Sequence, residues 1–210
     1  MGKASKHAAV WLVRVGPTSW EEEGRLTGSA DLPLGASGLA AAKDRARLLK
    51  GHSISAILCG PDEASVATAQ IVADSTGAVV KVQAGLAEVG LGLWEGLRAT
   101  ELEERSPSMY RQWRQDPADV RVPGGEAIEI ARARMIEVYR KAVPKLATVH
   151  ETVIVALRPM ALGLTRCWLE GRQTSELWDL ATGGAGVERL TLDCDRLRER
   201  LGLAVVRTSA

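Results

Sequence analysis

The feature that most constrains this chain is an alternation of short apolar runs with longer stretches of helical period. The short runs are rich in β-branched residues, which predicts buried strands. We expect strands at Val10–Val13, Ile54–Cys59, Ala78–Val82, Val153–Leu157, Val187–Leu192 and Leu203–Val206. The helical stretches are Ala36–Leu49, Glu63–Asp74, Glu126–Ala147, Ala161–Leu169 and Asp195–Leu201. Buried strands separated by helices predict an α/β fold, a three-layer α/β/α sandwich around a mostly parallel sheet.

The length of 210 residues fits one domain, which we expect to span residues 1–210. The Gly- and Pro-rich pieces between the predicted elements are expected to be loops, because none is long or polar enough for an interdomain linker. In open parallel sheets, ligands bind beyond the carboxyl ends of the strands. The segments expected to border a site are therefore Arg14–Gly16, Cys59–Glu63 and Arg158–Met160.

Charge and composition exclude several classes of function. The net charge is +1 with both signs interleaved, so we expect no nucleic-acid partner and no binding to an anionic membrane surface. No apolar run approaches the ~20 residues that a membrane span needs, and the N-terminal apolar run is too short for a signal peptide. The cysteines Cys59, Cys167 and Cys194 are few and widely spaced, which is typical of free thiols in a reducing compartment. The sequence therefore predicts a soluble, cytoplasmic protein.

Five short sequence segments follow one another along the chain and together form a recognisable set. The first, Leu12–Trp20, reads LVRVGPTSW. The others are Gly24–Gly28, Asp31–Leu34, Leu86–Leu97 and Val122–Glu126. In this order and spacing they resemble the motifs of the histidine phosphatase superfamily, in its phosphoglycerate mutase-like and ribazole phosphatase-like branch. The resemblance implies a phosphoglycerate mutase-like fold.

In that family one histidine attacks phosphorus, while two arginines and a second histidine hold the phosphate and an acid protonates the leaving oxygen. Matched by motif, Arg14 corresponds to the first arginine and Glu88 to the acid. Val15 stands at the position of the attacking histidine, Ala64 at that of the second arginine and Arg158 at that of the second histidine. The resemblance therefore implies a degenerate member that lacks both active-site histidines and has no intact catalytic set.

None of the three histidines is expected to replace the missing ones. His7, His52 and His150 each come just before a predicted strand, hence at the amino end of the sheet. The expected site is at the carboxyl end, five or more strand residues away at ~3.3 Å each.

The remaining charged residues allow two interpretations. Arg14 and Arg158 would end adjacent strands, where two guanidiniums could hold a small anion such as phosphate or a phosphate ester. Alternatively, each pairs with a neighbouring acid such as Asp62 or Glu88. For Glu88 the structural role is favoured over that of an acid awaiting substrate.

Other chemistry is less well supported. Cys59 lacks the arginine of a thiol phosphatase, because Ser65 occupies that position, so a buried inert thiol is favoured. Asp193 and Asp195 have no third ligand nearby, so we expect no metal site, and no cofactor is indicated. The tryptophans Trp94, Trp113, Trp168 and Trp178 either form a partner surface or close a core that lacks phenylalanine.

The sequence thus favours a pseudophosphatase that binds a protein partner, associates with itself or senses a small anion. One alternative is a weak phosphatase acting on a small phosphate ester, in which water attacks with help from Arg14, Arg158 and Glu88. Another is a structural subunit of an assembly.

Overall fold

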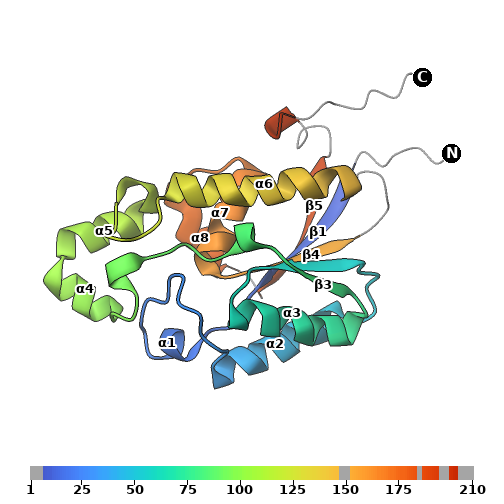
Figure 1. The fold of residues 1–210 in the computed structure, drawn as a ribbon, viewed down its shortest axis with the longest axis horizontal. Coiled ribbons are helices and arrows are strands. Elements are labelled where there is room, and N and C mark those ends of the chain that lie inside the picture. Colours follow the sequence, from blue (N-terminus) through green and yellow to red (C-terminus); the bar gives the residue numbers. More distant parts are fainter. Residues whose placement is uncertain (1–6, 147–151, 184–185, 194–198, 203–210) are drawn as a thin grey trace.

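The fold is centred on one β-sheet, seen in a computed structural model that describes residues 7–146, 152–183, 186–193 and 199–202 (Figure 1). Within this part of the chain the sheet has five strands in the order β3-β2-β4-β1-β5. They are β1 (His7–Arg14), β2 (Ala56–Cys59), β3 (Val79–Val82), β4 (Val153–Leu157) and β5 (Val187–Asp193). The first four are parallel, and β5 runs antiparallel to β1. The prediction of a mostly parallel sheet is confirmed; the expected strand at Leu203–Val206 lies outside the described residues.

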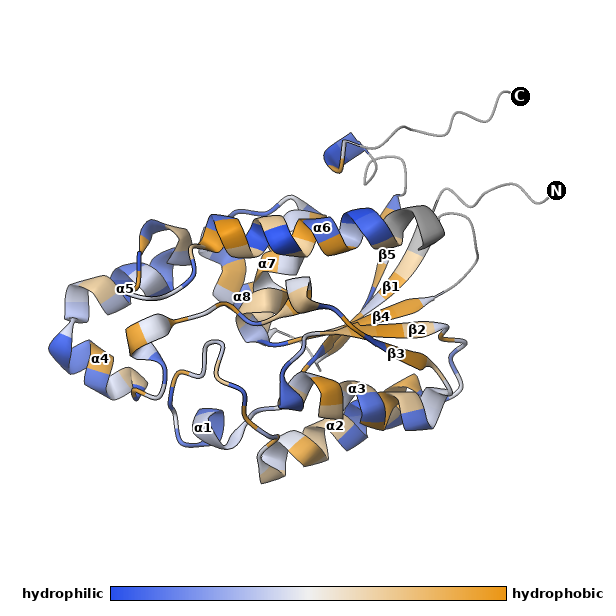
Figure 2. Ribbon diagram, viewed as in Figure 1, coloured by the Kyte–Doolittle hydropathy of each residue, from blue (hydrophilic) through white to orange (hydrophobic). Residues whose placement is uncertain are grey.

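Helices cover both faces of the sheet, as predicted for three layers (Figure 1). One face carries α2 (Ala36–Leu49) and α3 (Glu63–Thr76), and the other carries α6 (Ile128–Leu146), α7 (Pro159–Glu170) and α8 (Leu177–Thr182). Because successive strand side chains point to opposite faces, β1 supplies both layers: Leu12 packs in the cluster with α6 and α7, and Val13 packs in the cluster with α2 and α3. Figure 2 shows the inner strands β2 and β4 as apolar, whereas helices such as α6 carry both apolar and polar residues.

Several short elements are absent from the sequence prediction. They are α1 (Ser19–Glu22), α4 (Ala99–Arg105), α5 (Pro107–Gln115), α8 and the 3-10 turns η1 (Ala84–Leu86), η2 (Gly92–Trp94), η3 (Pro117–Asp119) and η4 (Thr174–Glu176). The predicted helix Asp195–Leu201 lies largely outside the described residues, as do Cys194 and Asp195. Helix α7 begins two residues earlier than predicted, since Pro159 is well suited to the first helical position.

Helices α4 and α5 lie away from the helical layers, beyond the carboxyl ends of the strands (Figure 1). Helix α5 is anchored there by aromatic contacts. The ring of Trp113 is 5.5 Å from that of Trp94 and 4.6 Å from that of Trp178. Trp94 and Trp113 are buried in the core, and the half-buried Trp168 and Trp178 pack against it.

Candidate functional site

Arg158 lies where β4 gives way to α7, at the carboxyl end of the central strands, and only 2% of it is exposed. Its guanidinium is 3.4 Å from the carboxylate of Glu21 and 3.9 Å from that of Asp62. It also donates to the carbonyl of Ala30 at 3.4 Å. These contacts are long, and its buried Nε has no partner among the described residues. Two carboxylates therefore compensate the charge of Arg158.

Glu88 caps the amino end of α7. Its Oε1 accepts hydrogen bonds from the N–H groups of Val89 (2.8 Å) and Ala161 (2.9 Å), and its Oε2 accepts one from Met160 (2.9 Å). The first N–H groups of a helix lack partners inside the helix and favour negative charge, so this position suits a carboxylate. Burial nevertheless raises the pKa of Glu88, while Arg158 and the three N–H groups act in the opposite direction.

The loop that carries Glu88 is held by Arg134 of α6. The Nε and Nη2 of Arg134 donate to the two carboxylate oxygens of Glu126, at 2.8 and 2.7 Å. The same guanidinium donates to the carbonyls of Gly85 (3.0 Å), Ala87 (2.7 Å) and Glu88 (3.0 Å). One side chain thus holds three backbone carbonyls of the loop that carries Glu88.

Two small cavities, of about 120 and 180 Å³, border Arg158 and Glu88. Their charged lining residues are the carboxylates Glu21, Asp31, Asp62 and Glu88 and the arginines Arg25 and Arg158. Four acids therefore face two bases, and each cavity is smaller than the roughly 300 Å³ at which ligand pockets usually begin. The surroundings of Arg158 and Glu88 are therefore acidic and closely packed.

Val15 and Ala64 lie together in the apolar cluster under α2 and α3, with 2% and 0% of their surfaces exposed. Cys59 belongs to the same cluster, and burial, assisted by Asp62, raises the pKa of its thiol to about 11. A thiol with that pKa is neutral at pH 7 and a poor nucleophile. Val15 and Ala64 have no lone pair, and the thiol of Cys59 is not ionised at neutral pH, so none of the three is an effective nucleophile there.

Arg14 has different surroundings from Arg158. It ends β1, its backbone N–H donates to the carbonyl of Gly186 at 2.8 Å, and its side chain makes no hydrogen bond or ion pair with any described residue. Arg45 of α2 reaches the same glycine, with its Nε 2.6 Å from where a Cβ on Gly186 would stand. Burial and the charge of Arg14 lower the pKa of Arg45. Neither Arg14 nor Arg45 lines the cavities beside Arg158.

Two contributors were missed by the sequence analysis. Glu21 pairs with Arg158 from the short helix α1, where it also closes a capping box with Thr18. The spacing Thr18-x-x-Glu21 is a readable signal for such a helix start. Arg45 has no comparable signal, because an arginine in a helix of this pattern is usually solvated.

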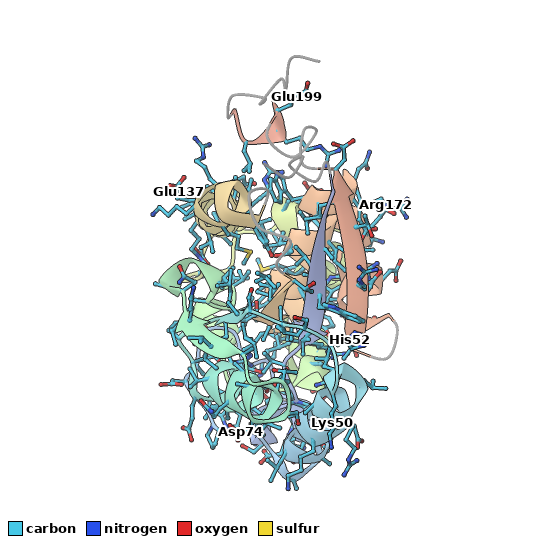
Figure 3. The ribbon with its side chains drawn as sticks, turned by 90° about the vertical axis from the view of Figure 1, so that its right-hand side faces the viewer. Lys50, His52, Asp74, Glu137, Arg172 and Glu199 are labelled. Carbon is cyan, nitrogen blue, oxygen red and sulfur yellow. The ribbon has the colours of Figure 1, made fainter. Side chains whose placement is uncertain are left out.

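The histidines lie at the other end of the sheet. His7 opens β1, and His52 precedes β2 and packs its ring 5.0 Å from that of Trp11. Figure 3, which views the molecule from the right-hand side of Figure 1, labels His52 at this amino end. His150 lies outside the described residues.

The described ranges contain no group of three or more His, Cys, Asp or Glu residues that could hold a metal ion. No helix in them is long and apolar enough to cross a bilayer.

The fold is shared with solved phosphatase structures. A structure of mycobacterial glucosyl-3-phosphoglycerate phosphatase complexed with VO3 superposes with a TM-score of 0.76 at 24% identity, covering 87% of this chain and 90% of that one. The alpha-ribazole phosphatase of Shigella flexneri gives a TM-score of 0.70 at 22% identity, covering 88% and 96%.

Sequence relatives agree with this placement. Phosphoserine phosphatase 1 of Hydrogenobacter thermophilus is 26% identical over 174 residues, 83% of this chain and 82% of the relative. The Salmonella choleraesuis protein named "Probable phosphoglycerate mutase GpmB" is 30% identical over 170 residues, 78% of each chain. The family model of the histidine phosphatase superfamily (branch 1) matches residues 10–201. The chain therefore belongs to the histidine phosphatase superfamily.

Proposed function

We propose that this chain is a catalytically inactive member of its superfamily, a pseudophosphatase. The observation that carries the proposal is Val15, which stands where the family motif has its attacking histidine. A valine side chain has no lone pair and cannot carry a phosphoryl group. The burial of Val15 and Ala64 in one apolar cluster supports the proposal, because both side chains contribute to core packing instead of facing a substrate.

We propose further that the chain senses a small anion, a phosphate or phosphate ester, through Arg14. The Arg14 guanidinium has no described partner, and Arg45 brings a second positive charge to the same glycine. Two half-buried guanidiniums that make no ion pair with a carboxylate of the described residues favour an anion between them. Arg158 is less available, because Glu21 and Asp62 already face it. The network of Arg158 and Glu88 is then structural.

Purified protein is expected to hydrolyse 4-nitrophenyl phosphate no faster than buffer between pH 5 and 8. Loss of a catalytic nucleophile costs on the order of 10⁶-fold in rate. The measurement is release of nitrophenolate, with Arg14→Ala assayed alongside the wild type. Turnover by the wild type that disappears in Arg14→Ala would support the weak-phosphatase alternative and overturn the pseudophosphatase proposal. Equal traces in both proteins would be contamination, in agreement with it.

Phosphate titration is expected to shift the backbone amide NMR signals around Gly186, with a Kd on the order of 1 mM. That affinity follows from two charge-assisted hydrogen bonds of ~1.5–3 kcal/mol each. Arg45→Gln should abolish the shifts. Arg47→Gln, on the same helix but exposed and paired with Asp44, should leave them unchanged.

Two other outcomes would redirect the proposal for Arg14. NMR shifts that centre on Arg158 and vanish in Arg158→Gln would show that the anion binds at Arg158 instead. No response up to about 30 mM phosphate, well above the expected Kd, would favour the structural-subunit alternative.

A further inference from the structure

A cleft of about 600 Å³ lies at the carboxyl end of α7, the end opposite to Glu88. A helix of twelve residues rises ~18 Å, so the cleft is remote from the Arg158 network. Its volume is within the ~300–1,000 Å³ typical of small-molecule sites. The cleft is separate from the cavities at Arg158, because it shares no lining residue with them. A ligand of this cleft is therefore independent of the function proposed above.

Positive charge exceeds negative charge in this cleft. Its charged lining residues are Arg132, Arg172, Arg200 and Asp116. Both carboxylate oxygens of Asp116 are already engaged, by the N–H of Ala118 (3.0 Å) and the hydroxyl of Thr174 (3.1 Å). One acid that is internally bonded thus faces three guanidiniums.

Two of the three arginines have no carboxylate partner among the described residues. Arg132 lies on α6, is exposed, and makes no hydrogen bond or ion pair with any of the described residues. Within the described ranges, Arg200 donates to backbone carbonyls, those of Trp168 (2.9 Å) and Leu169 (3.0 Å). The third, Arg172, pairs with Glu176 at 2.7 Å, and Figure 3 shows its side chain at the outer surface. Arg132 and Arg200 therefore retain donors for an anion.

Gly171 places Arg200 at the cleft. Its φ of +72° is the left-handed conformation that glycine adopts without penalty at a helix end. A Cβ at this position would also stand 2.8 Å from Nη2 of Arg200. Any other residue would thus strain the backbone and displace the guanidinium from the last turn of α7.

Apolar side chains also line the cleft. Leu164 is buried in it, and the half-buried ring of Trp168 packs 5.4 Å from that of Tyr139. Cys167 also lines the cleft, but burial raises the pKa of its thiol to about 11, so it adds no charge at pH 7. The site offers a cationic edge beside a planar, apolar surface.

From this arrangement we propose that the cleft binds a small phosphorylated molecule with an aromatic body. The phosphate faces Arg132 and Arg200, where guanidinium donors suit its oxygens. The ring lies against Trp168, where aromatic pairs gain ~0.5–1.5 kcal/mol beyond simple burial.

The test is an NMR titration of ¹⁵N-labelled protein with phenyl phosphate, compared with inorganic phosphate and with phenol. Phenyl phosphate is expected to shift the indole N–H of Trp168 and the amide of Gly171 saturably, with a Kd below about 1 mM. Inorganic phosphate and phenol should each bind at least about 10-fold more weakly, because phosphate lacks the ring contact and phenol lacks the contact with the arginines. The Gly186 amide serves as an internal monitor, since shifts there report Arg14 instead.

The matched variants are Arg132→Gln and Arg140→Gln, two turns apart on α6. Arg132→Gln should weaken phenyl phosphate binding about 10-fold, since one charge-assisted contact is lost. Arg140 pairs with Glu137 and does not line the cleft, so Arg140→Gln should change nothing. No saturable shift of Trp168 up to about 10 mM, equal binding of phenyl and inorganic phosphate, or equal effects of the two variants would each overturn the proposal.

Discussion

Replacing Glu88 with alanine is expected to lower the free energy of unfolding by about 3–5 kcal/mol. The change leaves three buried N–H groups, those of Val89, Met160 and Ala161, without an acceptor. Each unsatisfied buried donor costs ~1–3 kcal/mol. It also removes the negative charge at the amino end of α7. Urea denaturation followed by far-UV circular dichroism measures the loss.

Glu88→Gln is the control, because its amide oxygen still accepts while its shape is nearly kept. We expect it to cost about 1–2 kcal/mol near neutral pH. A loss in Glu88→Ala no larger than in Glu88→Gln would show that the N–H groups find other acceptors, contrary to the capping role.

The difference in stability between the wild type and Glu88→Gln is expected to depend on pH. Burial raises the pKa of Glu88 above its ordinary value of 4.5, so the folded state binds this proton more tightly than the unfolded state does. The stabilisation that results is fully present below about pH 4.5 and is lost as pH rises through the folded-state pKa. The stability of wild type relative to Glu88→Gln should therefore fall as pH increases. A relative stability that rises with pH would mean that Arg158 and the N–H groups outweigh burial.

Arg134→Lys is expected to destabilise the fold by about 3–5 kcal/mol, although it keeps the charge. A lysine ammonium cannot reproduce the paired bonds to Glu126 together with those to the carbonyls of Gly85, Ala87 and Glu88. For a chain of this size, 1 kcal/mol corresponds to roughly 2–4 °C in Tm. Thermal unfolding should therefore move down by about 10 °C.

Arg140→Lys makes the same chemical change at an exposed position of α6, where the only ion pair is with Glu137 among the described residues. It should alter stability by less than about 0.5 kcal/mol. If Arg134→Lys also stayed within that range, the guanidinium would not be holding the Glu88 loop.

The sheet was predictable because buried parallel strands leave continuous β-branched runs. Val153–Leu157 is apolar throughout and forms the central strand β4, and Ile54–Cys59, apolar apart from Ser55, contains the neighbouring strand β2. The short helices were not predictable in this way. Helix α5 is amphipathic, with Tyr110 and Trp113 on its buried side, but at nine residues it is too short to be stable alone and depends on tertiary aromatic contacts.

The site was predictable only in part. Sequence reasoning identified Glu88 and Asp62 as possible partners of Arg158, and the structure places Asp62 at 3.9 Å from its guanidinium. It did not anticipate that Glu88 would turn its oxygens to the α7 backbone, because that depends on how a loop from residue 83 onward meets a helix some seventy residues later. The neighbourhood of Arg14 and Arg45 likewise arises from the approach of α2 to the start of β5.

The capping of α7 by Glu88 has a consequence for any ligand that approaches this end of the sheet. A carboxylate tethered beside its N–H donors acts as an intramolecular competitor, with an effective concentration of millimolar or higher. An external phosphate must displace it rather than fill a vacancy, and displacement leaves Glu88 buried beside Asp62 without its three donors. The side chain of Glu88 thus occupies the N–H groups at the start of α7 that an external anion would otherwise use.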